Sequence, residues 1–98
     1  MNLGLVIGNV WATRKVETLK GRRLLIVQPL TFDRQNAGDP LIALDTMDAG
    51  PGDHVIYVSS AEATIPFRPA LTPTDATIVG VVDSVDLESG SWQAESLA

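Results

Sequence analysis

A Gly-Pro-Gly turn between two short apolar runs is the feature that most restricts the fold of this chain. The turn is Ala49-Gly50-Pro51-Gly52-Asp53, and the runs on its two sides are Leu41–Asp45 and His54–Ser59. Proline fixes φ at about −65° and lacks an N–H, whereas glycine accepts positive φ, so the turn interrupts any regular element. The run after it is dense in β-branched and aromatic residues, which favours a strand. The segment is therefore predicted to be strand, turn and strand.

Glycine also marks the first apolar run, Leu3–Thr13, which is predicted to be a strand. Its two glycines, Gly4 and Gly8, point to the same face if the run is one regular strand. Glycine inside a strand marks a bend or the close approach of another backbone. We therefore expect this strand to belong to a small, sharply coiled barrel.

Two more runs complete a set of five predicted strands. Arg23–Leu30 is a strand ended by Pro29, which cannot donate to a ladder, and the polar turn Thr18–Gly21 joins it to the first strand as a hairpin. The stretch 31–40 is polar and rich in Asn, Asp and Gly, which predicts a loop. Ile78–Val85 is predicted to be the fifth strand.

The connection before the fifth strand is expected to be irregular. Residues 61–73 contain three prolines, which leave room for at most a turn of helix. Short strands, glycine-marked bends and this insertion fit an all-β, five-stranded barrel of the OB type. The chain of 98 residues makes one domain, which we place at residues 1–87. Residues 88–98 form a polar C-terminal tail with a lone Trp92, either mobile or laid on a neighbouring molecule.

Charge is divided unevenly along the chain, whose net charge is −5. Five of the seven basic residues lie between Arg14 and Arg23, whereas eleven of the twelve acids lie from Asp33 onward. Two interpretations stay open. The basic corner is a solvated hairpin tip, or its Arg22 and Arg23 meet an acidic surface of a neighbouring copy, as head-to-tail ring contacts permit.

Composition also limits the cellular location. The chain has no Cys, which rules out disulfides and thiolate metal sites. Its start, Met-Asn-Leu-Gly, lacks the basic region and apolar core of a signal peptide. No apolar run reaches the ~20 residues that cross a bilayer. We therefore expect a cytoplasmic protein without membrane contact.

An OB barrel raises nucleic-acid binding as an alternative function. Single-strand binders need a positive groove and exposed aromatic rings on which bases stack. This chain has two Trp, one Tyr and two Phe, and its net charge has the wrong sign. An OB-type nucleic-acid or small-ligand binder stays open as the second interpretation, resting mainly on the basic corner.

Catalysis has less support. His54 is the only His, and it falls in a predicted strand beside a turn, where a surface or interface imidazole is commoner than a general base. No nucleophile elbow, P-loop or dinucleotide fingerprint is present. Asp45, Asp48 and Asp53 could supply oxygen ligands to Ca²⁺ or Mg²⁺, but their spacing does not fit an EF-hand, and Asp is common at turns. We therefore expect that the protein is not an enzyme and that it binds neither a cofactor nor a metal ion.

Four groups of residues, in their order along the chain, carry a family resemblance that reaches from Met1 to about Val85. They are Val6-Ile7-Gly8 with Ala12-Thr13 and Lys15; Gly21 with Leu24–Leu30; Asp45 with Ala49-Gly50 and Gly52-Asp53; and Asp75-Ala76 through Val82-Asp83. Together they resemble the pentameric vertex proteins of bacterial microcompartment shells, which include carboxysome and ethanolamine-utilisation vertex proteins. The chain departs from that pattern at Asp48, where the family typically has Gly, and at Thr64, where it often has Arg.

The resemblance implies a structural protein of the microcompartment shell and not a catalyst. It implies an OB-like barrel, a cyclic homopentamer at the fivefold vertices of a polyhedral shell, and hexameric shell proteins as partners. We expect two sets of functional residues. The subunit interface is predicted to contain Asp45, Ala49, Gly50, Gly52, Arg22 and Arg23, and the central pore is predicted to be lined by Ser59, Ser60, Ala61 and Glu62.

Overall fold

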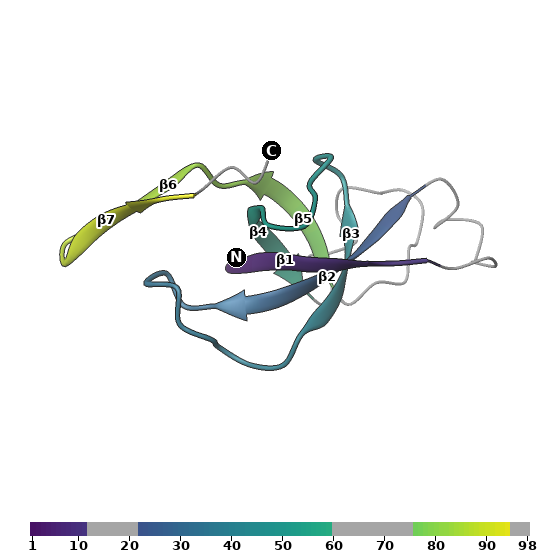
Figure 1. The fold of residues 1–98 in the computed structure, drawn as a ribbon, viewed down its shortest axis with the longest axis horizontal. Helices are drawn as coiled ribbons and strands as arrows, with labels where there is room; N and C mark the ends of the chain where they lie inside the picture. Colours follow the sequence, from purple (N-terminus) through teal and green to yellow (C-terminus); the bar gives the residue numbers. More distant parts are fainter. Residues whose placement is uncertain (12–21, 60–75, 95–98) are drawn as a thin grey trace.

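The computed structural model describes residues 1–11, 22–59 and 76–94 of the chain, which contain seven β-strands (Figure 1). The strands are β1 (Asn2–Val10), β2 (Arg23–Leu30), β3 (Leu41–Asp45), β4 (His54–Ser59), β5 (Ala76–Val81), β6 (Ser84–Leu87) and β7 (Gly90–Gln93). The described residues contain no helix, so the expected all-β class is confirmed. The turn expected at Thr18–Gly21 and the irregular segment 61–73 lie outside the described residues.

Five of these strands close into a barrel in the order β1-β2-β3-β5-β4. All barrel pairs are antiparallel except β3 with β5, which are parallel. A closed, five-stranded barrel leaves no long open edge, and this arrangement is that of the OB type. The predicted fold is therefore confirmed, and the bounds of β2, β3 and β4 are those predicted.

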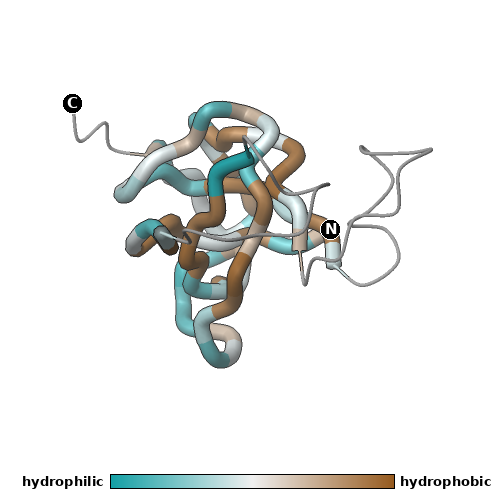
Figure 2. The backbone as a smooth tube through the Cα atoms, turned by 90° about the vertical axis from the view of Figure 1, so that its right-hand side faces the viewer, coloured by the Kyte–Doolittle hydropathy of each residue, from teal (hydrophilic) through white to brown (hydrophobic). Residues whose placement is uncertain are grey.

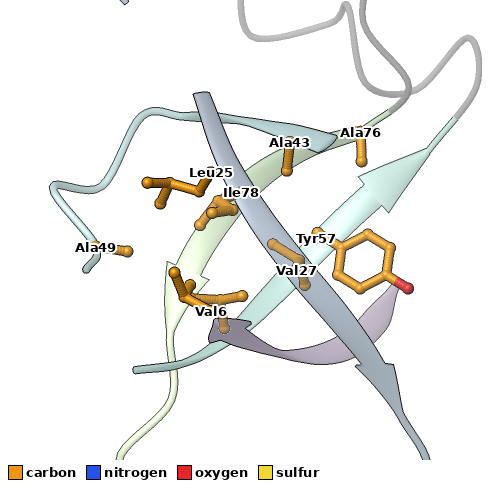
Figure 3. Packing of buried hydrophobic residues seen from close by; sticks show 9 residues of the cluster. Val6, Leu25, Val27, Ala43, Ala49, Tyr57, Ala76 and Ile78 are labelled. Atoms are coloured by element: carbon orange, nitrogen blue, oxygen red, sulfur yellow. The ribbon is translucent and has the colours of Figure 1, made fainter. Parts of the chain in front are cut away.

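The barrel interior is filled by side chains that alternate along the strands. The inward positions form one apolar cluster (Figure 3), comprising Val6, Leu25, Val27, Ala43, Ala49, Val55, Tyr57, Ala76 and Ile78. Small alanines among larger aliphatic residues let strands on opposite sides approach each other across a narrow barrel. Hydrophobic residues form continuous stretches of the chain, which alternate with hydrophilic stretches (Figure 2).

Gly4 is a point of close approach inside this barrel. A Cβ atom at this position would overlap Cγ1 of Val27 and lie 3.1 Å from Cε1 of Tyr57. The expected close approach is thus confirmed at Gly4. The expectation that Gly8 shares its face is wrong, because the register of β1 against β2 shifts between Val6 and Gly8. This bulge turns Gly8 to the outer face, where a Cβ would make ordinary contact with Ile26 at 3.5 Å.

The fifth strand ends earlier than predicted. We expected Ile78–Val85, but β5 stops at Val81 and the chain leaves the barrel, after which β6 and β7 form a separate two-stranded sheet. The last hydrogen bond to the barrel runs from Val82 N to His54 O at 2.8 Å, and Asp83 O instead accepts from Ala94 N, closing the base of the hairpin. The domain boundary that we placed after residue 87 falls in the turn of this hairpin, and residues 95–98 lie outside the described part.

Candidate subunit interface

Asp45, at the end of β3, organises the turn that follows it. Its Oδ1 accepts hydrogen bonds from the backbone N–H groups of Met47 at 2.9 Å and Ala49 at 3.2 Å. Its Oδ2 accepts from Nη1 of Arg23, directly opposite on β2, at 3.3 Å. The Asp45 side chain is only 2% exposed, so all of these bonds satisfy a buried carboxylate. Asp45 therefore has a role within its own chain.

Asp48 holds an unusual backbone conformation in the same turn. Its φ is +56°, in the left-handed region that glycine adopts most easily and that Asp tolerates better than most other residues. Asp can therefore adopt the backbone conformation at this position, where the resembled family typically has Gly. The Asp48 carboxylate is 96% exposed and lies 3.1 Å from Nη1 of Arg23. Arg23 is consequently paired with two acids of its own chain.

The Gly-Pro-Gly tract forms a hydrogen-bonded β-turn from Gly50 to Asp53. Asp53 N donates to Gly50 O at 3.0 Å, and Gly52 has a φ of +92°. Pro at the second position and a positive-φ Gly at the third are the signature of a type II turn. The Asp53 carboxylate also accepts from Gly50 N at 2.9 Å. Sequence reasoning predicted this turn, and its geometry explains Gly52.

Gly50 differs from Gly52 in one respect that bears on assembly. Its φ is not positive, and a Cβ atom placed on it would meet no other atom within 4 Å. Nothing in ranges 1–11, 22–59 and 76–94 therefore requires glycine at this position. A requirement for glycine here would come from contact with another molecule, which is the role that sequence reasoning assigned to Gly50.

The outer face of the barrel beside this turn is apolar. Leu25, Val27 and Ala43 point into the core, so the alternating residues of β2 and β3 point outward. The remaining residues of these two strands are aliphatic and paired in register, Leu24 with Leu44 and Ile26 with Ile42. Leu44 is fully buried within the chain and offers no surface to another molecule. Leu24, Ile26 and Ile42 are half-buried. An apolar outer face on a small barrel is a surface suited to association.

The structure brings together five of the six predicted interface residues. Asp45, Ala49, Gly50 and Gly52 belong to one turn, and Arg23 reaches it from β2. Arg22 directly precedes β2 and is half-buried. Sequence reasoning missed Thr46, whose hydroxyl donates to Ile78 O on β5 at 2.5 Å and fixes the start of the turn. A hydroxyl residue directly after a strand-ending Asp was the available signal.

Of the predicted pore residues, only Ser59 is described. It is the last residue of β4, opposite Ala76 at the start of β5. Ser60, Ala61 and Glu62 lie outside the described residues, as does Thr64. The lining of a pore by these four residues therefore stays a prediction.

The alternative functions gain nothing from the described residues. The three Asp side chains that could supply cation ligands do not converge on one point. Asp45 and Asp53 accept backbone N–H bonds, and Asp48 points to Arg23. In ranges 1–11, 22–59 and 76–94, no three His, Asp or Glu side chains form a group that could hold a metal ion. Over the same ranges, no helix is long and apolar enough to span a membrane. Trp92 is buried, so it offers no face on which a base could stack, whereas Trp11 is 92% exposed. One exposed Trp on a chain of net charge −5 does not make the positive groove that a single-strand binder needs.

Comparison with known proteins identifies the family. The sequence pattern described as "Ethanolamine utilisation protein EutN/carboxysome" matches residues 1–83. The chain belongs to the EutN/CcmL family. The match spans the whole barrel and ends one residue before β6.

Named EutN/CcmL relatives agree with this assignment. The chain is 38% identical over 86 residues to the bacterial microcompartment shell vertex protein GrpN of Rhodospirillum rubrum. The aligned region covers 88% of this chain and 97% of GrpN. It is 35% identical over 91 residues to the carboxysome shell vertex protein CcmL of Synechocystis, covering 93% and 91%. The solved GrpN structure, a pentameric microcompartment shell protein, superimposes with a TM-score of 0.79 over 89% of this chain and 99% of GrpN.

Proposed function

We propose that this chain is a structural shell protein that forms the pentameric vertices of a polyhedral bacterial microcompartment. The observation that carries the proposal is the EutN/CcmL family match over the entire barrel, joined to relatives that are named as shell vertex proteins. The superposition on a pentameric shell protein at 38% identity supports the same oligomer. The location that follows is the shell of a bacterial microcompartment.

The proposed ring is held by contacts between two different surfaces of adjacent copies. In a cyclic pentamer each subunit presents one patch to the next copy and a second patch to the previous copy. The Gly50 turn is one such patch, because its open side accepts a neighbouring backbone without a clash. The apolar outer face carrying Leu24, Ile26 and Ile42 supplies area whose burial favours association. Arg22 places a positive charge at the same end of β2 as this turn.

The role of such a pentamer is geometric. Flat hexagonal sheets do not close into a polyhedron, whereas fivefold units at the corners introduce the curvature that closure requires. The partners of the ring are then hexameric shell proteins that form the facets. This role requires no catalysis, and we propose none. A central opening lined by Ser59 to Glu62 would lie on the fivefold axis of the ring.

Native mass spectrometry of the purified full chain tests the oligomer. The expected result is one dominant species of five copies over the micromolar range. A dominant monomer, dimer or hexamer would contradict the proposed ring.

Co-expression with a hexameric shell protein tests the vertex role separately. With the chain present, electron microscopy should show closed polyhedral particles, and without it open sheets or tubes. A pentamer that leaves the sheets open would keep the ring and refute the vertex.

A further inference from the structure

Within the described part of the chain, the side chain of Trp92 connects the hairpin of β6 and β7 to the loop after β2 and to the start of β4. A two-stranded hairpin is at best marginally stable alone in water, and this one extends away from the barrel (Figure 1). Trp92, in the middle of β7, is only 8% exposed. Its indole Nε1 donates to the carbonyl oxygen of Phe32, in the loop after β2, at 2.7 Å. The position of the hairpin therefore depends on the contacts of the Trp92 side chain with the loop after β2.

Two further groups contact the indole ring. The His54 ring at the start of β4 lies with its centroid 4.9 Å from that of Trp92, at an interplanar angle of 55°. The guanidinium carbon of Arg34 lies 4.8 Å from the Trp92 ring centroid. Arg34 has a positive φ of 68° in a loop fixed by hydrogen bonds between Thr31 and Gln35, so its side chain is presented by an ordered turn.

His54 is set in this contact as a neutral imidazole. Its Nδ1 is buried and has no hydrogen-bond partner among the residues that the structure describes. Protonation would place an N–H at this nitrogen without an acceptor, which is costly for a buried donor. It would also add a second positive charge beside Arg34. Attraction between an imidazolium and the indole face would favour protonation of His54. The guanidinium of Arg34 already provides a cation for that ring, however.

The charged groups that act on His54 in the described part of the chain come from two elements. The loop after β2 contributes Arg34, which together with burial lowers the pKa of His54 below its usual 6.5, burial being the larger cause. The turn before β4 contributes Asp53, whose carboxylate acts in the opposite direction. The neighbouring strands contribute the uncharged Leu5, opposite His54 on β1, and Trp92 itself.

We propose that Trp92, His54 and Arg34 form a pH-sensitive latch, which holds the β6–β7 hairpin in place while His54 is neutral and releases it when His54 is protonated. Above pH 6.5 the imidazole is neutral in both the docked and the released hairpin, so docking has its full strength. As the pH falls below 6.5 the released form takes up a proton first, and docking weakens until the pH passes the pKa of the docked form. This inference goes beyond the vertex role and does not depend on it.

The composition of the chain makes the latch measurable in the intact protein. His54 is the only His, so its imidazole NMR signal reports one pKa. The chain has two Trp, and Trp11 is 92% exposed, so the exchange rate of the Trp11 indole N–H is an internal reference for that of Trp92. A Trp11→Phe variant assigns the two signals. Native mass recorded at each pH shows whether the oligomer is unchanged.

Between pH 8 and pH 5.5 the protection of Trp92 relative to Trp11 should fall. At pH 5.5, one unit below 6.5, the expected fall is at most about tenfold, and it is smaller if docking lowers the His54 pKa by less than one unit. The pKa in the released state is read from Trp92→Ala, where it should return toward 6.5. A constant protection ratio through the His54 titration would overturn the latch. So would a His54 pKa that is the same in Trp92→Ala as in the parent chain.

Three conservative variants keep the test valid if Trp92→Ala disturbs folding. Trp92→Phe keeps the ring but removes the N–H bond to Phe32, and should raise the His54 pKa part of the way. His54→Gln cannot titrate, so Trp92 protection should become independent of pH. Arg34→Asn, which tolerates positive φ, should raise the His54 pKa and shrink the pH effect. An undiminished pH response in His54→Gln would assign it to other groups and refute the proposal.

Discussion

Gly52 donates its backbone N–H to the carbonyl oxygen of Val6 at 2.8 Å, fastening the Gly-Pro-Gly turn to β1. Val6 in turn donates to Asp53 O at 2.9 Å, so the turn and the first strand share two hydrogen bonds. Gly52 therefore contributes to the fold of one chain. Gly50, two residues earlier, has room for a side chain, because a Cβ atom placed on it meets no described atom within 4 Å. The two glycines of one turn can consequently be separated by mutation.

Gly50→Val is expected to reduce pentamer formation while leaving the free energy of unfolding within about 0.5 kcal/mol of the parent chain, because the new side chain meets open space in the monomer. Native mass and chemical denaturation measure the two effects. The matched control is Gly52→Ala, which should cost about 1–2 kcal/mol of unfolding free energy, since φ is +92° there. If Gly50→Val lowered stability as much as Gly52→Ala does, Gly50 would belong to the monomer fold only.

Gly4→Ala is expected to destabilise the barrel by about 1–3 kcal/mol, because the added methyl overlaps Val27 in a packed core. Thermal and denaturant unfolding of the two variants measure the cost. Gly8→Ala, on the same strand, places its methyl in ordinary contact with Ile26 and should change stability by less than about 0.5 kcal/mol. Equal costs at the two positions would show that the bulge between Val6 and Gly8 does not exist in solution.

Asp45→Ala is expected to cost about 1–3 kcal/mol of unfolding free energy, because two backbone N–H groups and Arg23 lose a buried acceptor. The control is Asp48→Asn, which keeps a residue that tolerates positive φ and removes only an exposed partner of Arg23. Its effect should be below about 1 kcal/mol. Urea denaturation at neutral pH compares them. An Asp48→Asn effect as large as that of Asp45→Ala would contradict the assignment of roles.

Arg22→Glu is expected to reduce the pentamer fraction more at about 0.01 M salt than at about 1 M, where charges on neighbouring copies are screened. Arg23→Glu should weaken the ring and also lower monomer stability, because it removes the pair with Asp45. Native mass or light scattering across the salt series provides the measurement. Assembly that is insensitive to Arg22→Glu at both salt concentrations would identify the basic corner as a solvated hairpin tip.

The predictions that succeeded depended on short segments. The bounds of β2, β3 and β4 follow from runs of five to eight strand-forming residues flanked by turn residues, and the Gly50–Asp53 turn follows from the φ preferences of Pro and Gly. Asp45, Ala49, Gly50 and Gly52 lie together because they are neighbours in sequence, and their role at a subunit interface stays a prediction. Arg23 reaches Asp45 only because β2 and β3 pair in the register that places them opposite.

By itself, the sequence determined β2, β3 and β4, the turn and the family, because strand propensity, turn conformation and residue order are local properties of the chain; the hairpin of β6 and β7 was not predicted. Tertiary structure alone decided the bulge after Val6, the end of β5 at Val81 and the burial of Trp92 against Phe32, 60 residues away. In the predicted run Ile78–Val85, Asp83 and Ser84 favour a turn and are a local signal for the break, although Val82 and Val85 favour a strand as much as Val79 does. What ends β5 at Val81 is the finite length of the partner strand β4, whose last available carbonyl, on His54, is taken by Val82.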